Sequence, residues 1–268
     1  MEIKTKYHQL VSYLKKLDSV LVAYSGGVDS TLLLAAALDA LGRDKVLAVT
    51  ATSPIHSPEE MDEARRLTNV LGVQWQDMAS SEMGNPDFLS NPPDRCYHCK
   101  KIKLAGLIEL AVLKGLAYVV EGSNYSDLQD YRPGYRAVQE TGVLSPLLEI
   151  RMTKEEIRSA SRKRGISCWD KPSNACLCSR IPYGQAITVD RLHRVYMAEK
   201  IIVNMGFNTV RVRDHGDIAR IEVAVSDLEK ICQDENRVYL SQRIKELGFK
   251  YVTVDMMGYR TGSMNIDR

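Results

Sequence analysis

The stretch "SVLVAYSGGVDSTLLLAAALDAL", residues 19–41, decides the fold class. Residues 19–25 form a continuous apolar run that is typical of a fully buried strand, and residues 29–41 have the length and composition of a helix. Between them, two adjacent glycines let the backbone turn tightly and approach a ligand without interference from a Cβ atom. A buried strand that passes directly into a helix predicts the first unit of a parallel sheet.

The same alternation of strand and helix continues over the first two thirds of the chain. Ser57 is a natural N-cap before Pro58, and Thr153 stands three residues before Glu156, which is the spacing of a capping box. The predicted strands are 45–51, 73–78 and 116–124, and the predicted helices are one from Ser57, 98–115 and 153–165. We therefore expect an α/β domain whose parallel sheet is covered by helices on both faces.

The pattern changes after residues 171–184, a loop with two prolines and a glycine. Beyond it, the periodicity predicts the order helix, strand, strand, helix, strand, over 188–206, 209–216, 218–225, 235–248 and 250–256. This order suits a smaller α+β domain, so we expect two domains, residues 1–184 and 185–268.

The composition is that of an ordinary soluble protein, with 268 residues, 44% hydrophobic residues, 26% charged residues and a net charge of +2. No overall positive field points to nucleic acid, and no apolar run is long enough to span a bilayer. The first twenty residues lack the apolar centre of a signal peptide, so we expect a cytoplasmic protein.

In a reducing compartment, closely spaced cysteines are more often metal ligands or catalytic groups than disulfides. Two such pairs are present, Cys96 with Cys99 and Cys176 with Cys178. Cys168 and Cys232 stand alone in apolar surroundings, and we predict that both are buried.

The glycine turn carries the strongest chemical signal. A helix that begins near Asp29 and Ser30 offers free N–H groups and the positive end of its dipole to a phosphate. Ser25 and Ser30 add hydroxyl donors, and Asp29 is suited to hold Mg²⁺ or to orient phosphates. The turn lacks the lysine of a Walker A loop and the spacing of the dinucleotide fingerprint. The plain alternative is a tight turn with a capping serine.

"SGGVDS", residues 25–30, resembles the pyrophosphate loop (PP-loop) of the N-type ATP pyrophosphatases. This resemblance implies that ATP is cleaved between its α and β phosphates, with Mg²⁺, to adenylate an acid or a carbonyl oxygen. It assigns ATP contacts to residues of the loop, to the segment 50–57 beside the adenine, and to the segment 121–127 opposite, namely Ser25, Gly26, Gly27, Asp29, Ser30, Ala51 and Gly122.

Four later segments narrow the family: "DYRPGYRA" (130–137), "ACLCSRIPYG" (175–184), "TVRVRDHGDIARIE" (209–222) and "GFKYVTVDMMGYRTGSMN" (248–265). With the glycine loop they resemble the pyridinium-3,5-biscarboxylic acid mononucleotide sulfurtransferases, the sulfur insertases of nickel-pincer nucleotide synthesis for lactate racemase. The resemblance implies a homo-oligomeric enzyme that adenylates each carboxylate of this small nucleotide and converts it to a thiocarboxylate.

The same resemblance assigns roles to residues of the second half. Arg211 and Arg213 match a pair that binds substrate phosphate, and positions two apart on a strand share a face. Glu199 matches an acidic residue of the site, and Arg180 is a further candidate for phosphate. The alternative for the two strand arginines is a solvated edge. The segment Asp130–Arg132 is either a loop scaffold or a contact.

Cys176 matches the cysteine that one branch of this family sacrifices as its sulfur donor. Other members hold a [4Fe-4S] cluster on three cysteines, and the presence of Cys96 and Cys99 favours this version, with Cys178 as a possible ligand. Three cysteines leave one iron open for a ligand that reacts. From spacing alone, structural zinc on all four cysteines is equally acceptable, and a disulfide between Cys96 and Cys99 is a further alternative.

We therefore expect an adenylating, ATP-dependent sulfurtransferase. The alternatives are a tRNA-thiolating enzyme with the same loop and a nucleotide-binding module with structural zinc. A net charge of +2 and few aromatic residues give little support to an RNA partner. The sequence does not identify the sulfur donor.

Overall fold

The computed structural model describes residues 3–129, 132–172 and 175–264. The chain forms two compact units, the first made of Met1–Phe88 and Asp94–Asn174 and the second of Leu89–Pro93 and Ala175–Arg268. The boundary that we expected after residue 184 falls inside the second unit.

The first unit contains a four-stranded sheet in the order β3-β2-β1-β4, in which every pair is parallel. The strands are β1 (Val20–Ala23), β2 (Val46–Thr52), β3 (Gln74–Ala79) and β4 (Tyr118–Val120). This arrangement confirms the predicted parallel sheet, although β4 is shorter than the predicted 116–124. The strands β2 and β3 follow β1 on one side, and β4 is then added on its other side, so the strand order reverses beside β1. Such a switch point is where open α/β sheets bind ligands.

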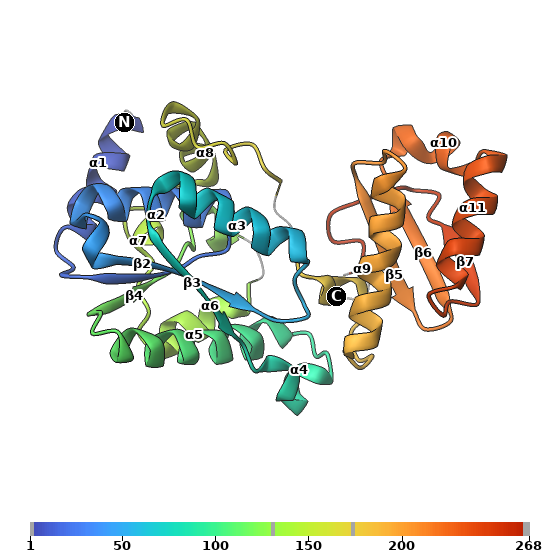
Figure 1. Cartoon of the computed structure of the whole chain (residues 1–268), viewed down its shortest axis with the longest axis horizontal. Coiled ribbons are helices and arrows are strands. Elements are labelled where there is room, and N and C mark those ends of the chain that lie inside the picture. Colours follow the sequence, from blue (N-terminus) through green and yellow to red (C-terminus); the bar gives the residue numbers. More distant parts are fainter. Residues whose placement is uncertain (1–2, 130–131, 173–174, 265–268) are drawn as a thin grey trace. The chain divides into compact units, whose positions relative to one another are not determined.

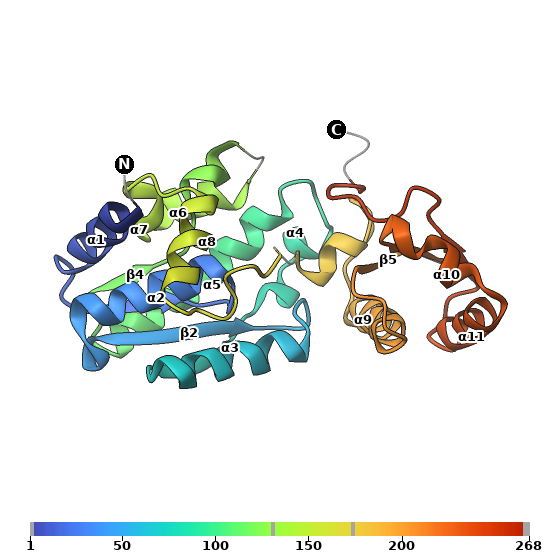
Figure 2. The ribbon, with the colours of Figure 1, turned by 90° about the horizontal axis from the view of Figure 1, so that it is seen from above.

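Helices cover both faces of this sheet, as predicted (Figures 1 and 2). One face packs against α1 (Ile3–Leu14), α2 (Val28–Leu41), α3 (Pro58–Leu71), α7 (Pro146–Glu149) and α8 (Lys154–Lys163). The other face packs against α5 (Arg95–Leu113) and α6 (Gly134–Thr141). The alternation along β1 explains both layers, since Val20 and Val22 belong to the first core and Leu21 to the second.

The predicted helix starts are confirmed at two places. The Ser57 and Thr153 side chains each accept from the backbone N–H three residues later, and Glu60 and Glu156 complete the capping boxes. Helix α5 begins earlier than the predicted residue 98, so Cys96 and Cys99 are its second and fifth residues.

The second unit has a three-stranded sheet in the order β5-β6-β7, with β5 and β6 antiparallel and β6 and β7 parallel. Its elements are α9 (Val189–Asn204), β5 (Val210–His215), β6 (Ile218–Val223), α10 (Leu228–Cys232), α11 (Asp234–Lys245) and β7 (Tyr251–Val254). The predicted order is confirmed, with the short α10 as an addition. The remaining short helix of the chain is α4 (Pro86–Leu89).

The short segment Leu89–Pro93 belongs to the second unit because its backbone and side chains bond there. The Ile187 N–H donates to the Leu89 carbonyl at 2.8 Å, and Asn91 Nδ2 donates to the Pro182 carbonyl at 2.7 Å. The chain therefore leaves the first unit before Leu89 and returns to it at Asp94, two residues before Cys96.

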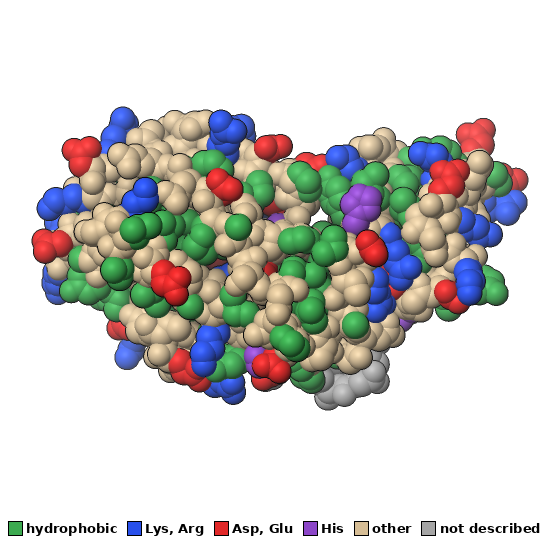
Figure 3. Space-filling view, turned by 60° about the horizontal axis from the view of Figure 1, so that its bottom comes forward, with side chains coloured by type: hydrophobic (Ala, Val, Ile, Leu, Met, Phe, Trp, Pro, Cys, Tyr) green, Lys and Arg blue, Asp and Glu red, His purple; other side chains and the backbone are tan. Residues whose placement is uncertain are grey.

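Charged side chains of both signs are interspersed on the face of the molecule that Figure 3 draws, without one continuous basic area among the residues coloured by type. Within the described ranges, no helix combines the length and the apolarity that crossing a bilayer requires.

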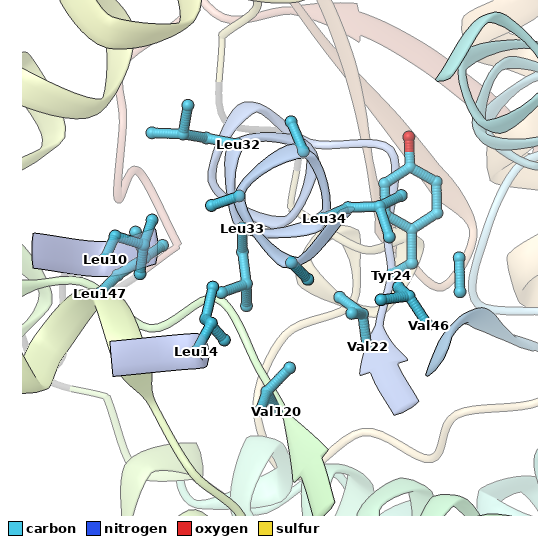
Figure 4. Packing of buried hydrophobic residues seen from close by; sticks show 14 of the residues in the cluster. Leu10, Leu14, Val22, Tyr24, Leu32, Leu33, Leu34, Val46, Val120 and Leu147 are labelled. Carbon is cyan, nitrogen blue, oxygen red and sulfur yellow. The ribbon is translucent and has the colours of Figure 1, made fainter. Parts of the chain in front are cut away.

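Helix α2 is apolar around most of its circumference, and Figure 4 shows why. Leu32, Leu33 and Leu34 are all buried and point in different directions, Leu33 toward Leu14 of α1 and Leu34 toward Tyr24 at the sheet. Burial of each leucine contributes about 2 kcal/mol of hydrophobic stabilisation. The start of α2, where the glycine turn lies, is therefore held by the core of the first unit.

Candidate functional site

The glycine turn follows β1 directly. The Tyr24 N–H donates to the Val49 carbonyl at 2.8 Å, so the sheet continues to the edge of the turn. Gly26 has a φ of +70°, and a Cβ atom on it would lie 3.2 Å from the Cα of Ala64 in α3. This position needs glycine for both its backbone conformation and its space.

Two serine hydroxyls hold the shape of the turn. Ser30 Oγ donates to the Gly27 carbonyl at 3.1 Å and accepts from the Ser25 N–H at 3.3 Å. Gly27 is the N-cap residue of α2, and it has no side chain to accept from the first N–H groups of the helix. The geometry therefore presents backbone donors and the positive end of the helix dipole to an anion.

The two other predicted ATP segments end at the same edge of the sheet. A Cβ atom on Gly122 would lie 3.2 Å from the Ser30 backbone nitrogen, so the chain after β4 packs against the start of α2. Ala51 is half-buried near the carboxyl end of β2, the neighbour of β1. The structure thus brings the predicted ATP residues together at the carboxyl ends of three strands.

Asp29 lies at this edge between two different environments. Its Oδ2 accepts from Lys154 Nζ at 2.6 Å, whereas its Oδ1 is buried and has no hydrogen-bond partner among the described residues. Burial raises the pKa of Asp29, and the Lys154 ammonium opposes that rise. A lone carboxylate oxygen beside a phosphate-binding loop fits a hard cation such as Mg²⁺.

The sequence analysis missed Lys154, although a local signal exists. A lysine in the first turn of a helix is disfavoured by the helix dipole. Its presence at residue 154 therefore indicates that its charge interacts with a group outside the helix.

The first turn of α5 lies near the same edge. Cys96 is exposed and Cys99 half-buried, and residues three apart on a helix share a face. Lys100 Nζ donates at 2.7 Å to Glu121, the buried residue directly before Gly122. The cysteine turn is thereby connected to the ATP edge within the first unit.

Glu121 is the centre of a hydrogen-bond network that the sequence analysis also missed. Its carboxylate accepts from the Ser123 N–H at 3.1 Å and from Ser145 Oγ at 2.5 Å. Burial alone would raise its pKa, but Lys100 and these hydroxyls together hold the pKa below the ordinary value.

A second buried network lies after β2 and β3. Glu82 is fully buried and accepts from Ser53 Oγ at 2.5 Å, while Lys103 of α5 lies 3.8 Å from Glu82 and 3.3 Å from His56 Nε2. Burial and the Lys103 charge lower the pKa of His56 to about 4. His56 lies in the segment that we expected beside the adenine, but its neighbours Lys103 and Glu82 could not be predicted from that segment.

In the second unit, Cys176 directly precedes the 3₁₀ helix η4 (Leu177–Arg180). Arg180 is only 2% exposed, and its Nη1 donates to the carbonyls of Ala175 at 2.6 Å and Cys176 at 3.1 Å. Its Nε and Nη2 donate to the two oxygens of Glu199 at 2.9 and 3.0 Å. Glu199 therefore orients Arg180, and Arg180 in turn braces the backbone at Cys176.

Arg213 and Arg211 of β5 lie beside this group. Arg213 donates to Glu222, which is fully buried, at 2.7 Å and to the Ser179 carbonyl at 3.2 Å. Burial and the nearby Arg180 charge lower the pKa of Arg211, and the Arg211 guanidinium lies 5.3 Å from the Tyr259 ring centroid. The three predicted arginines are thus gathered near Cys176. Glu199, which pairs with Arg180, was a predicted site residue, whereas Glu222, which pairs with Arg213, was not.

The two closely spaced cysteine pairs lie in different units. Cys96 and Cys99 belong to the first unit, and Cys176 and Cys178 belong to the second. Cys178 is completely buried, Cys168 is buried as predicted, and Cys232 is exposed, so the prediction for Cys232 was wrong because α10 turns it outward at its last residue.

Within the described ranges, no group of three or more histidines, cysteines, aspartates or glutamates is arranged to hold a metal ion. Asp130 and Tyr131, which we weighed as contacts, lie outside the described residues, and Arg132 pairs with Asp127 at 2.9 Å.

Comparison with known proteins identifies relatives over nearly the whole chain. The NAD synthase family matches residues 2–84, the part that contains the glycine loop. An uncharacterized protein of Synechocystis sp. is 42% identical over 98% of both chains. The pyridinium-3,5-bisthiocarboxylic acid mononucleotide synthase of Lactiplantibacillus plantarum is 40% identical over 98% of this chain and 95% of its own.

A more distant match is the tRNA-specific 2-thiouridylase of Acidothermus cellulolyticus, 30% identical over 65% of this chain and 58% of its own. The full-length match to a synthase, together with the ATP-binding loop, confirms the predicted α/β fold and an enzyme that uses ATP. The chain belongs to the family of the pyridinium-3,5-bisthiocarboxylic acid mononucleotide synthases.

Proposed function

We propose that this enzyme converts pyridinium-3,5-biscarboxylic acid mononucleotide to the bisthiocarboxylic acid by adenylating each carboxylate and replacing its activated oxygen with sulfur. The observation that carries the proposal is the pairing of two regions in one chain. One is a glycine loop suited to the polyphosphate of ATP, and the other is a cysteine braced beside three arginines.

In the first step, a substrate carboxylate oxygen attacks the α-phosphorus of ATP, and the bond from that phosphorus to the bridging oxygen of pyrophosphate breaks. The leaving pyrophosphate carries the growing negative charge, so donors at the start of α2 stabilise the transition state. Asp29 Oδ1 would hold the Mg²⁺ that accompanies the phosphates. Gly122 and Ala51 line the nucleotide on either side.

Arg211 and Arg213 would bind the phosphate of the substrate nucleotide, because guanidinium groups match phosphate oxygens in pairs. Arg180 makes four of its contacts with Glu199 and with the carbonyls of Ala175 and Cys176, which precede η4. We therefore assign Glu199 and Arg180 the task of positioning Cys176 and the nearby arginines.

Sulfur delivery is the second step, and we propose that Cys96, Cys99 and Cys176 hold a [4Fe-4S] cluster for it. The donor set fits in its chemistry, since thiolates are the ligands of such clusters and Cys96 and Cys99 are three residues apart on one helix. When bound with one iron open, the cluster would supply an exchangeable sulfide. Sulfide attacks the adenylated carbonyl carbon, and the bond to AMP breaks as the thiocarboxylate forms. The complete burial of Cys178 favours packing over ligation.

A second candidate uses the same adenylation but takes sulfur from Cys176 itself, leaving dehydroalanine. The contacts of Arg180 with the carbonyls of residues 175 and 176 favour it, because they fix one particular cysteine beside the arginines. Thiolation of tRNA is a third candidate, which rests on the partial match to a 2-thiouridylase. Structural zinc and assembly into a homo-oligomer stay predictions.

The test is to measure iron, zinc and acid-labile sulfide on protein purified without oxygen, and then pyrophosphate release and thiocarboxylate formation with the dicarboxylate nucleotide or tRNA. We expect iron and sulfide in similar amounts, with release that depends on the dicarboxylate. Cys176→Ala should abolish sulfur transfer and keep pyrophosphate release, whereas Cys232→Ala, a change at an exposed cysteine of the same unit, should keep both.

Zinc without sulfide would contradict the cluster. Loss of the mass of hydrogen sulfide from the wild-type chain after turnover would support the sacrificial version. Release that depends on tRNA would overturn the assignment of the substrate.

A further inference from the structure

Lys154 occupies a position that the stability of its own helix does not explain. It is the first residue of α8, at the end where the helix dipole disfavours a cation, and it is followed by Glu155 and Glu156, which suit that end. Its ammonium does not extend into solvent but lies 2.6 Å from Asp29 Oδ2, with both side chains about one quarter exposed, at 27% and 25%. The lysine faces the glycine loop.

The backbone around Lys154 is fixed to the segment that follows Gly122. The Lys154 N–H donates to Ser126 Oγ at 3.0 Å, and the Tyr125 N–H donates to the Met152 carbonyl at 2.9 Å. Because Gly122 packs on the Ser30 nitrogen, the start of α8 and the start of α2 are held in one arrangement. The backbone positions from which Lys154 and Asp29 reach each other are therefore set by the fold.

The loop presents an electrostatic problem that this contact addresses. Asp29 carries a negative charge in the first turn of the helix whose N–H groups face the polyphosphate. Two like charges about 4 Å apart repel by about 4 kcal/mol at the effective dielectric of a protein surface. A cation must offset the carboxylate if the nucleotide is to approach, and Lys154 is one that the chain itself provides.

The contact also separates the two oxygens of Asp29. Lys154 occupies Oδ2, whereas Oδ1 is buried and has no hydrogen-bond partner among the described residues. We propose that Lys154 is a positioning residue that fixes Asp29 with Oδ1 presented to the Mg²⁺ of the nucleotide and offsets the carboxylate charge as ATP enters. This inference rests on the proposed function, since it requires ATP at the loop.

Metal-free ATP and MgATP should depend on the Lys154 charge to different extents. When Mg²⁺ accompanies ATP, the metal itself screens the phosphates from Asp29. For metal-free ATP, Lys154 is the cation in direct contact with Asp29, while Arg132 acts on this carboxylate more weakly. Loss of the lysine charge should therefore weaken binding of metal-free ATP much more than binding of MgATP.

The experiment is isothermal titration of the full chain with ATP in EDTA and with MgATP. We expect Lys154→Met to weaken metal-free ATP by about thirtyfold and MgATP by about threefold, because the metal replaces most of the missing charge. Lys154→Arg should recover most of the loss, and Asp29→Asn in the Lys154→Met background should restore metal-free binding.

Lys6→Met is the matched control. Lys6 Nζ donates to the Arg151 carbonyl at 2.6 Å and to Glu156 at 2.8 Å, so the change loosens the same end of α8 without removing a contact of Asp29. The ratio of the two affinities should not move in this variant.

Equal weakening of both forms by Lys154→Met, or a fall in melting temperature alone as in Lys6→Met, would assign Lys154 a structural role and overturn the inference. Wild-type protein that binds neither form of ATP would instead overturn the proposed function.

Discussion

The two units each contain a region suited to an anion, but they build it from different parts of the chain. In the first unit the region is mainly backbone, formed by six consecutive residues, 25–30, at the start of one helix. In the second unit it is made of side chains from η4 and β5, and two carboxylates, the half-buried Glu199 and the fully buried Glu222, hold two of its three arginines in place.

This difference predicts two kinds of failure. A backbone site depends on the conformation of a short turn, so a change there should impair binding while the core around α2 keeps the fold. A side-chain site with buried counter-charges should lose stability when one partner is removed, since the other charge stays buried and loses its main contact. The following variants test this contrast.

The largest effect is expected at Arg213. Among the described residues, Arg213→Met leaves the fully buried Glu222 with Ser263 and the weaker contact of Arg220, at 3.2 Å. Loss of one partner of a buried ion pair costs about 3 kcal/mol of unfolding free energy. Chemical denaturation should show this loss in the transition of the second unit.

Arg211→Met is the matched change, two residues away on the same strand. Burial and, to a smaller extent, the nearby Arg180 charge lower the pKa of Arg211. Removal of the Arg211 charge relieves its repulsion with Arg180. We expect little change in stability and about a tenfold loss of affinity for the substrate nucleotide, the value of one lost charged contact. Equal destabilisation by both variants would remove the distinction between the two arginines.

The next effect concerns the glycine loop. Gly26→Ala introduces a Cβ atom 3.2 Å from Ala64 Cα at a φ of +70°. The loop must shift away from α3, and we expect at least about a tenfold loss of ATP affinity, since the backbone donors move by tenths of an ångström. Isothermal titration with MgATP measures this loss.

Gly142→Ala separates strain from space. Gly142 has the same φ of +70° but no atom within 4 Å of the added Cβ, and it ends α6. It should cost about 1 kcal/mol of stability through the left-handed backbone and leave ATP affinity unchanged. A loss of ATP affinity at Gly142 equal to that at Gly26 would show that the turn is not a local site.

The same contrast explains which features the sequence could predict. The buried strand, the glycine turn and the capping boxes at Ser57 and Thr153 each depend on neighbours within a few residues, so their periodicity and spacing sufficed. The parallel sheet followed from the repetition of these units. The start of α5 did not follow, because Arg95 and Cys96 precede its apolar periodicity.

The partners of charged residues could not be predicted, because they come from distant positions. Asp29 pairs with Lys154 across 125 residues, and Arg213 reaches Ser263 across 50. Periodicity shows which face a residue occupies but not which opposite charge the fold brings to it. The resemblance of the arginines to a known family predicts a role for them, while the structure shows the carboxylates that pair with Arg180 and Arg213.

Buried side chains also contribute to the predicted ATP edge of the first unit, in the network of His56, Lys103 and Glu82. His56 is held neutral by burial and by Lys103, which lower its pKa from 6.5 to about 4, although Glu82 acts in the opposite direction. The unfolded chain therefore takes up a proton at a higher pH than the folded chain. The free energy of unfolding should fall as the pH decreases from 6.5 to about 4, and this contribution is absent above that range.

His56→Gln removes this proton uptake and keeps a polar side chain of similar reach. We expect the wild type to lose about 1–2 kcal/mol more stability than the variant between neutral and acidic pH, after allowance for solvent screening of the half-buried ring. Urea denaturation of both proteins across this range gives the difference. Parallel pH profiles would mean that His56 titrates normally. The network of His56, Lys103 and Glu82 would then add nothing to the pH dependence of stability, and the ATP edge of the first unit would depend mainly on backbone contacts.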